Sequence, residues 1–305
     1  MIPVLLLTLV LVFFLMRMIP GNPLYSMFED ETLTKAEIDL LSEKYGFNDP
    51  IWKQFLDYFR NILRGDWGTS YFNDQPVFQN IFDVMEPTLL ITLYSSVISL
   101  VIGVPFGILA ATHRNSWIDY AVSSTSMVAT VIPGFCVGIG LLYLLAFKHP
   151  IFPLVGYTSI AKGGFWKSMY SLTLPSCAIG LSGVASLCRH TRSQMLDVLN
   201  ADYIRTARAK GLHERLVNYR HALKNVLAVI ITLVSNTVVT HLGGSTVIET
   251  VFSINGVGML SYASLNRRDY AQEQAILLFF ALIFIVMNIL LDIIYKMLDP
   301  RIELD

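Results

Sequence analysis

Long runs without a charged residue recur along the chain, and five of them have about the length of a membrane span. They lie between Glu86 and Arg114, Asp119 and Lys148, Lys167 and Arg189, Lys224 and Glu249, and Glu273 and Asp292. A bilayer core needs about 20 apolar residues in a helix that rises 1.5 Å per residue. A sixth apolar run, residues 2–19, is interrupted only by Arg17, whose side chain can reach the head groups. The pattern predicts an all-α membrane protein with six transmembrane helices.

Residues 2–19 are expected to form a retained span and not a cleaved signal peptide. The apolar run is longer than a usual signal core, and Pro20-Gly21-Asn22-Pro23 follows it where a small-residue cleavage site would stand. No Lys or Arg precedes the run. The sequence therefore leaves open whether a short basic leader stands before it.

Composition supports the membrane interpretation. Hydrophobic residues make up 54% of the chain and charged residues 15%, with a mean hydropathy of +0.55, whereas soluble proteins carry about 25% charged residues. A net charge of −1 indicates no nucleic-acid partner. The three cysteines, Cys136, Cys177 and Cys188, have neither zinc-ligand nor disulfide-framework spacing. They are expected to be small buried hydrophobic residues.

The polar region between the first two runs, residues 20–86, is acidic. It holds twelve Asp and Glu residues against five Lys and Arg residues. We predict one short helix that is N-capped by Thr34 and ends near Tyr45, and a second over residues 51–63. The region is too small for an enzyme domain. The predicted organisation is a first transmembrane helix over 1–19, a small external cap over 20–86, and a core with five further transmembrane helices over 87–305.

A basic loop at about residues 191–224 separates the fourth and fifth predicted spans. From Arg189 to Arg220 the chain has seven Lys and Arg residues against three acidic ones. Because Lys and Arg accumulate in cytoplasmic loops, this loop is predicted to lie in the cytoplasm, as are both termini, with the acidic cap outside.

The basic loop also carries the candidate functional residues. A short helix with small residues on its surface is predicted from Asp202, as its cap, to Lys210, with Gly211 as a left-handed end. Such a helix is suited to docking in a groove on another protein. A basic loop that only sets topology would not explain the Ala and Gly spacing. The predicted docking residues are Asp202, Tyr203, Arg205, Thr206, Ala207, Arg208, Ala209, Lys210 and Gly211.

This loop resembles the coupling loop of inner-membrane permeases in binding-protein-dependent ABC importers, in the oligopeptide, dipeptide and nickel branch. Further blocks similar to that family span nearly the whole chain, and they place it with the permease that carries a large external cap. In the family's E-A-A-x-x-x-G pattern, Arg205 and Thr206 replace Glu and the first Ala. The similar blocks are 17–23, 45–50, 65–70, 244–249, 256–258, 266–270 and 299–301.

The resemblance implies a type I importer fold and a defined set of partners. These are a second permease subunit, expected to be a different chain, two cytoplasmic ATPase subunits and an extracytoplasmic binding protein, in a bacterial or archaeal inner membrane. The chain contains no G-x-x-x-x-G-K-[ST] motif, so it is predicted to be no enzyme and to bind no cofactor, with ATP and Mg²⁺ used by the partner subunits. A peptide is the first expected substrate, and nickel or a nickel chelate the second.

Asn236, His241 and Thr130 are polar residues inside the predicted spans, and they are candidates for the transport pathway or for bonds between helices. Met127, in the third span with Thr130, is a further pathway candidate. No metal site is predicted. A secondary transporter or a channel without ATPase partners is the alternative, but the two halves of the chain show no repeat, and a channel would need no docking helix.

Overall fold

The computed structural model describes residues 2–18 and 35–298, and the elements in these ranges are helices. The chain divides into two compact units. Unit 1 combines the residues up to Glu86 with Gly256–Val286, and unit 2 combines Pro87–Asn255 with the residues from Met287 onward. Two long helices, α5 (Val77–Thr112) and α13 (Tyr270–Leu298), contribute to both units. The predicted all-α fold is confirmed.

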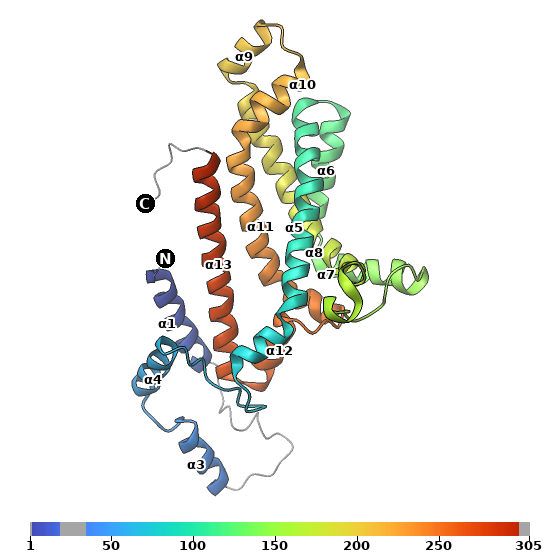
Figure 1. The fold of residues 1–305 in the computed structure, drawn as a ribbon. Coiled ribbons are helices and arrows are strands. Elements are labelled where there is room, and N and C mark those ends of the chain that lie inside the picture. Colours follow the sequence, from blue (N-terminus) through green and yellow to red (C-terminus); the bar gives the residue numbers. More distant parts are fainter. Residues whose placement is uncertain (1, 19–34, 299–305) are drawn as a thin grey trace. The chain divides into compact units, whose positions relative to one another are not determined.

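In unit 1, α1 (Ile2–Met18) and α4 (Ile51–Leu63) are neighbours (Figure 1), and aromatic side chains join them. The ring centroid of Phe55 lies 5.2 Å from Phe13 and 5.8 Å from Phe14. The Arg17 guanidinium lies 3.6 Å from the Phe13 ring centroid and donates to Gln54 Oε1, which links the end of α1 to α4. The predicted helices of the cap are confirmed as α3 (Lys35–Lys44) and α4, while the predicted Thr34 cap lies outside the described residues.

The segment that leads from α4 to α5 is fixed by the corner between α12 (Val257–Arg267) and α13. The Asp269 carboxylate accepts hydrogen bonds from Ser70 Oγ at 2.5 Å and from the Tyr71 backbone N–H at 3.2 Å. Burial raises the pKa of Tyr71 to about 12, so its phenol stays protonated. Two of the seven sequence blocks, 45–50 and 65–70, lie in turns and loops of unit 1. Residues 19–23 of the first block and the block 299–301 lie outside the described residues.

Among the described residues, four helices are long and apolar enough to cross a membrane, namely Val77–Thr112, Ile160–Leu199, Glu214–Val251 and Tyr270–Ile294. The third predicted span, between Asp119 and Lys148, is a bent pair of helical segments. The chain there bends by 96° between α6 (Trp117–Val131) and the segment Gly134–Lys148, which comprises α7 (Gly134–Leu141) and η1 (Leu142–Lys148). Pro133 stands at the bend after Ile132 in extended backbone, which proline favours in the preceding residue.

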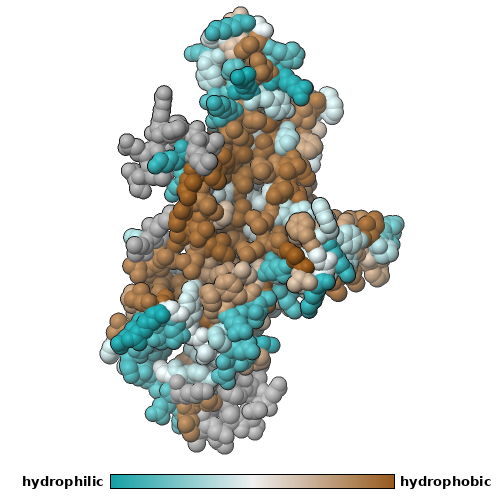
Figure 2. Space-filling model, in the orientation of Figure 1, coloured by the Kyte–Doolittle hydropathy of each residue, from teal (hydrophilic) through white to brown (hydrophobic). Residues whose placement is uncertain are grey.

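The bent pair brings the number of spans to at most five, and α1, with 17 residues, is a shorter apolar helix. Six spans are therefore not confirmed within residues 2–18 and 35–298. In unit 2, apolar side chains cover the outside of the long helices, whereas polar ones gather over the short helices at one end (Figure 2). Val101 and Met127 are 63% and 69% exposed. Apolar side chains exposed on this scale are what a lipid environment requires.

Candidate coupling site

The basic loop folds into a short helix, α9 (Asp202–Ala209), between α8 (Ile160–Leu199) and α10 (Glu214–Leu216). It lies beyond the ends of α8 and α11 (Leu223–Val251) in Figure 1. Gly211 ends it with a φ of +75°, and its N–H donates to Arg208 O at 2.9 Å. The predicted left-handed glycine is confirmed. The predicted cap is wrong, because Ala201 is the N-cap and Asp202 stands in the first turn, where its charge favours the positive end of the helix dipole.

One face of α9 is buried within this chain. Ile204 and Ala207 are 0% and 7% exposed, and they pack in a single cluster with apolar residues of α5, α8, η2 (Val217–Ala222) and α11. Ala207 therefore cannot belong to a docking face, contrary to the sequence expectation. The position of α9 is therefore fixed by contacts with α5, α8 and α11 together. The cluster comprises Ile108, Ala111, Met195, Ile204, Ala207, Val217, Ala222, Val226 and Ile230.

The opposite face of α9 is open. The exposed residues of this loop are Asp202, Tyr203, Arg205, Thr206, Arg208, Ala209, Lys210 and Gly211. Two ion pairs order this face: Arg208 Nε lies 2.8 Å from Glu214 Oε1, and Arg205 Nη1 lies 3.3 Å from Asp202 Oδ1. Exposed pairs contribute about 0–1 kcal/mol each. They therefore order the side chains more than they stabilise the fold.

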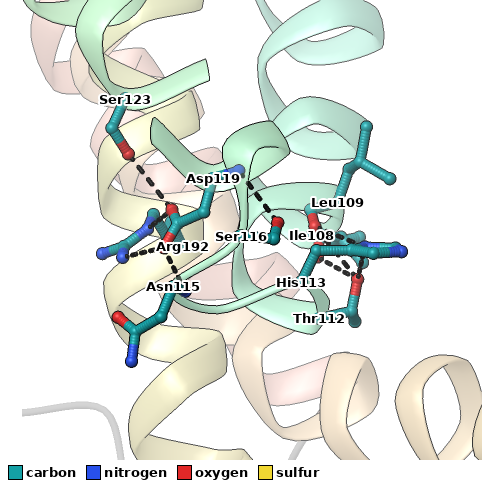
Figure 3. Close-up of polar contacts among 9 residues, drawn as sticks. All are labelled: Ile108, Leu109, Thr112, His113, Asn115, Ser116, Asp119, Ser123 and Arg192. Carbon is teal, nitrogen blue, oxygen red and sulfur yellow. Dashed lines mark hydrogen bonds and ion pairs between the residues drawn. The ribbon is translucent and has the colours of Figure 1, made fainter. Parts of the chain in front are cut away.

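An ion pair near the same end of unit 2, which the sequence analysis did not identify, joins α6 to α8. Arg192 donates from Nε to Asp119 Oδ1 at 2.5 Å and from Nη2 to Oδ2 at 2.7 Å (Figure 3). The Asp119 side chain also accepts from the Asn115 backbone N–H at 3.0 Å and from Ser123, while Ser116 caps α6 by accepting from the Asp119 N–H. In the sequence, the Ser116-x-x-Asp119 spacing is similar to a capping box and could have indicated the start of α6.

Comparison with known proteins identifies the family. Residues 103–304 match the family described as the binding-protein-dependent transport system inner membrane component. The oligopeptide transport system permease protein AppB of Bacillus subtilis (strain 168) is 38% identical over 304 residues, which cover 99% of this chain and 96% of that protein. The chain belongs to this family.

Two further relatives agree with this assignment. The dipeptide transport system permease protein DppB of Alkalihalophilus pseudofirmus is 35% identical, over 99% of this permease and 96% of the relative. The glutathione transport system permease protein GsiC of Escherichia coli (strain K12) is 34% identical, over 99% and 95% respectively. Membership confirms the predicted multi-pass inner-membrane permease subunit.

The fold of this permease is also that of a solved importer. An inward-facing structure of the MetNI methionine ABC transporter superposes with a TM-score of 0.61 over 73% of this chain and 98% of that chain. Sequence identity is 16%, so the structural similarity is evidence of a shared fold only. The predicted type I importer fold is confirmed.

The four predicted pathway residues lie in different surroundings within unit 2. Asn236 on α11 and Met127 and Thr130 on α6 are exposed, and Thr130 Oγ1 donates to Ser126 O at 2.8 Å and accepts from Arg189. His241 is only 2% exposed, with Nδ1 2.8 Å from Ser95 Oγ. His241 thus bonds α11 to α5, as polar groups do between membrane helices.

A second buried contact of unit 2 joins Thr88 to Glu249, a pairing that the sequence did not indicate. Thr88 Oγ1 donates to Glu249 Oε1 at 2.7 Å, which links α5 to α11 a second time. Only their positions in a three-dimensional bundle pair them, since they are 161 residues apart. Across residues 2–18 and 35–298, no three His, Cys, Asp or Glu residues come together as metal ligands would.

Proposed function

We propose that this permease transports peptides and that α9 couples its spans to a cytoplasmic ATPase subunit. The observation that supports coupling is the two-sided burial of α9. Ile204 and Ala207 are held in a core shared with α5, α8 and α11, while Tyr203, Thr206 and Lys210 remain exposed. A helix that is held by several spans on one side and exposed on the other can convert closure of an ATPase into movement of the spans.

The proposed assembly contains this chain, a second and different permease subunit, two ATPase subunits and an extracytoplasmic binding protein. ATP and Mg²⁺ are used by the ATPase subunits, since this sequence has no phosphate-binding loop. Both termini and α9 face the cytoplasm, as the excess of basic residues from Arg189 to Arg220 favours. The names of the relatives favour peptides over nickel as the substrate.

The test is reconstitution of the assembly in proteoliposomes with Thr206→Trp in this chain. Thr206 lies on the open face of α9, so the bulky ring obstructs docking without entering the core of unit 2. We expect peptide uptake and substrate-stimulated ATP hydrolysis to fall at least tenfold, while the variant still inserts and purifies. Arg114→Trp, at an exposed position in the α5–α6 turn, is the control for bulk and should transport normally.

Three outcomes contradict the proposal. Normal uptake by Thr206→Trp removes the coupling role of α9. Uptake that needs no ATP or no ATPase subunit favours a secondary transporter or a channel. Uptake of Ni²⁺ without uptake of labelled di- to hexapeptides replaces the substrate but leaves the coupling mechanism in place.

A further inference from the structure

A groove of about 550 Å³ lies in unit 2 between the last turns of α5 and the segment that leads from α9 to α11. Its wall is apolar and comes from α5, where Phe106, Ile108 and Leu109 line it. Phe106 and Leu109 are 48% and 38% exposed. These three residues belong to a helix that is apolar over the length of a membrane span, so the wall faces the hydrocarbon region near its edge.

The mouth of the groove is polar and cationic. Arg215, Tyr219 and His113 line it where α5 ends. Arg215 has no acidic partner among the described residues, because the neighbouring Glu214 is engaged by Arg208. His113 directs Nδ1 to Leu109 O at 3.0 Å (Figure 3). An exposed tyrosine beside an arginine is typical of the level of the lipid head groups.

A buried acceptor without a hydrogen bond also belongs to this groove. Asn218 lines it, and its carboxamide oxygen is buried and has no partner in the described part of the chain. Leaving a buried acceptor unpaired is unfavourable, so a donor from a ligand would stabilise it. Asn218 stands in η2, a π-helical turn, and such turns are frequent at functional sites.

We propose that this groove binds an anionic phospholipid of the cytoplasmic leaflet. The phosphate lies against Arg215 and Tyr219, an acyl chain follows Phe106 and Leu109, and a head-group hydroxyl donates to Asn218 Oδ1. The cytoplasmic leaflet is rich in anionic lipid, and basic pockets between membrane helices bind such head groups. An acidic protein segment matches the cationic mouth but not the apolar wall. The proposal rests on the orientation given under Proposed function.

The test measures lipid retention by the purified full-length chain and needs no partner subunit. The chain is titrated in detergent with phosphatidylglycerol or with phosphatidylcholine of the same acyl chains, and bound lipid is counted by native mass spectrometry. We expect phosphatidylglycerol to be retained about tenfold more strongly than phosphatidylcholine, a preference of about 1.4 kcal/mol. Arg215→Gln should bring the two lipids close to equal retention. Arg114→Gln removes one exposed cation from the neighbouring turn and should keep the preference.

Tyr219→Ala serves as a second variant that leaves the charge unchanged, and it should weaken retention of both lipids. Circular dichroism and size exclusion confirm that each variant is folded. Equal retention of the two lipids by the wild-type chain overturns the proposal. So does an unchanged preference in Arg215→Gln, because Arg215 would then not hold the phosphate. Neither result affects the proposed importer function, because transport is not the measured quantity.

Discussion

Gly211 has a backbone conformation that other residues rarely adopt. With φ at +75°, nothing lies within 4 Å of the position that a β-carbon would occupy. Any strain at this position therefore comes from the backbone and not from a clash. A β-carbon in the left-handed region costs about 1 kcal/mol or more, enough to shift the end of α9 and the exposed face that precedes it.

We therefore expect Gly211→Val to abolish coupled transport while the chain still inserts. The measurement is peptide uptake together with ATPase stimulation in the reconstituted assembly. Gly140→Val is the matched control, because Gly140 also has open space around its β-position but an ordinary φ. Equal activity of the two variants would show that the conformation of Gly211 has no role.

The ion pair between Asp119 and Arg192 is a second feature of single residues. Asp119 is 2% exposed, and removing its cation leaves a buried carboxylate without charge compensation. Because the Arg192 side chain is 30% exposed, we expect Arg192→Gln to destabilise the chain by about 2 kcal/mol, less than a fully buried pair. Asp119→Asn combined with Arg192→Gln should be less destabilised than the sum of the single variants, as thermal unfolding in detergent can measure. Additive effects would mean that the pair does not act as a unit.

At the scale of elements, α5 and α8 approach closely through glycines. A β-carbon on Gly107 would lie 2.6 Å from Cys188 O, and one on Gly103 would lie 2.8 Å from Val184 O. Small residues four apart allow membrane helices to pack backbone against backbone. The same two helices hold the Ile108 and Met195 that seat α9, so their separation sets how α9 is supported.

Gly107→Leu is accordingly expected to separate α5 from α8. The clash involves a backbone oxygen, which cannot move aside alone, and overpacking of this kind costs about 1–3 kcal/mol. The melting temperature in detergent should fall and coupled transport should weaken. Gly140→Leu, in open space on α7, should change neither quantity. An unchanged melting temperature for Gly107→Leu would contradict the close packing.

For the whole molecule, the proposed orientation assigns the acidic cap and the basic loop to opposite sides of the membrane. Asp57 on α4 and His213 before α10 are both exposed, so a cysteine at either position can report its side. In a background without Cys136, Cys177 and Cys188, Asp57→Cys should react with an impermeant thiol reagent in intact cells. His213→Cys should react only after permeabilisation. The reverse pattern would place α9 away from the cytoplasm and refute its coupling role.

The sequence by itself determined the fold class, the family, the bounds of α4 and the glycine that ends α9. Charge-free runs of membrane length require helices, because backbone groups in lipid must bond within their own segment. Short sequence patterns also predicted α4 and the left-handed conformation of Gly211, because the ends of helices depend on a few neighbouring residues. Gly103-x-x-x-Gly107 was an equally local signal for close packing that the sequence analysis did not use.

Only the tertiary structure decided which face of α9 is buried and which is exposed. From the sequence, Ala207 was expected in a docking surface, but the structure buries it with Ile204 against three spans. The pairing of Arg192 with Asp119 was likewise not predicted. Burial and pairing depend on residues that are far apart in the chain. The two residues of the ion pair, for example, are separated by 73 positions. A linear pattern records which residues are small, charged or apolar, and packing alone determines what they contact.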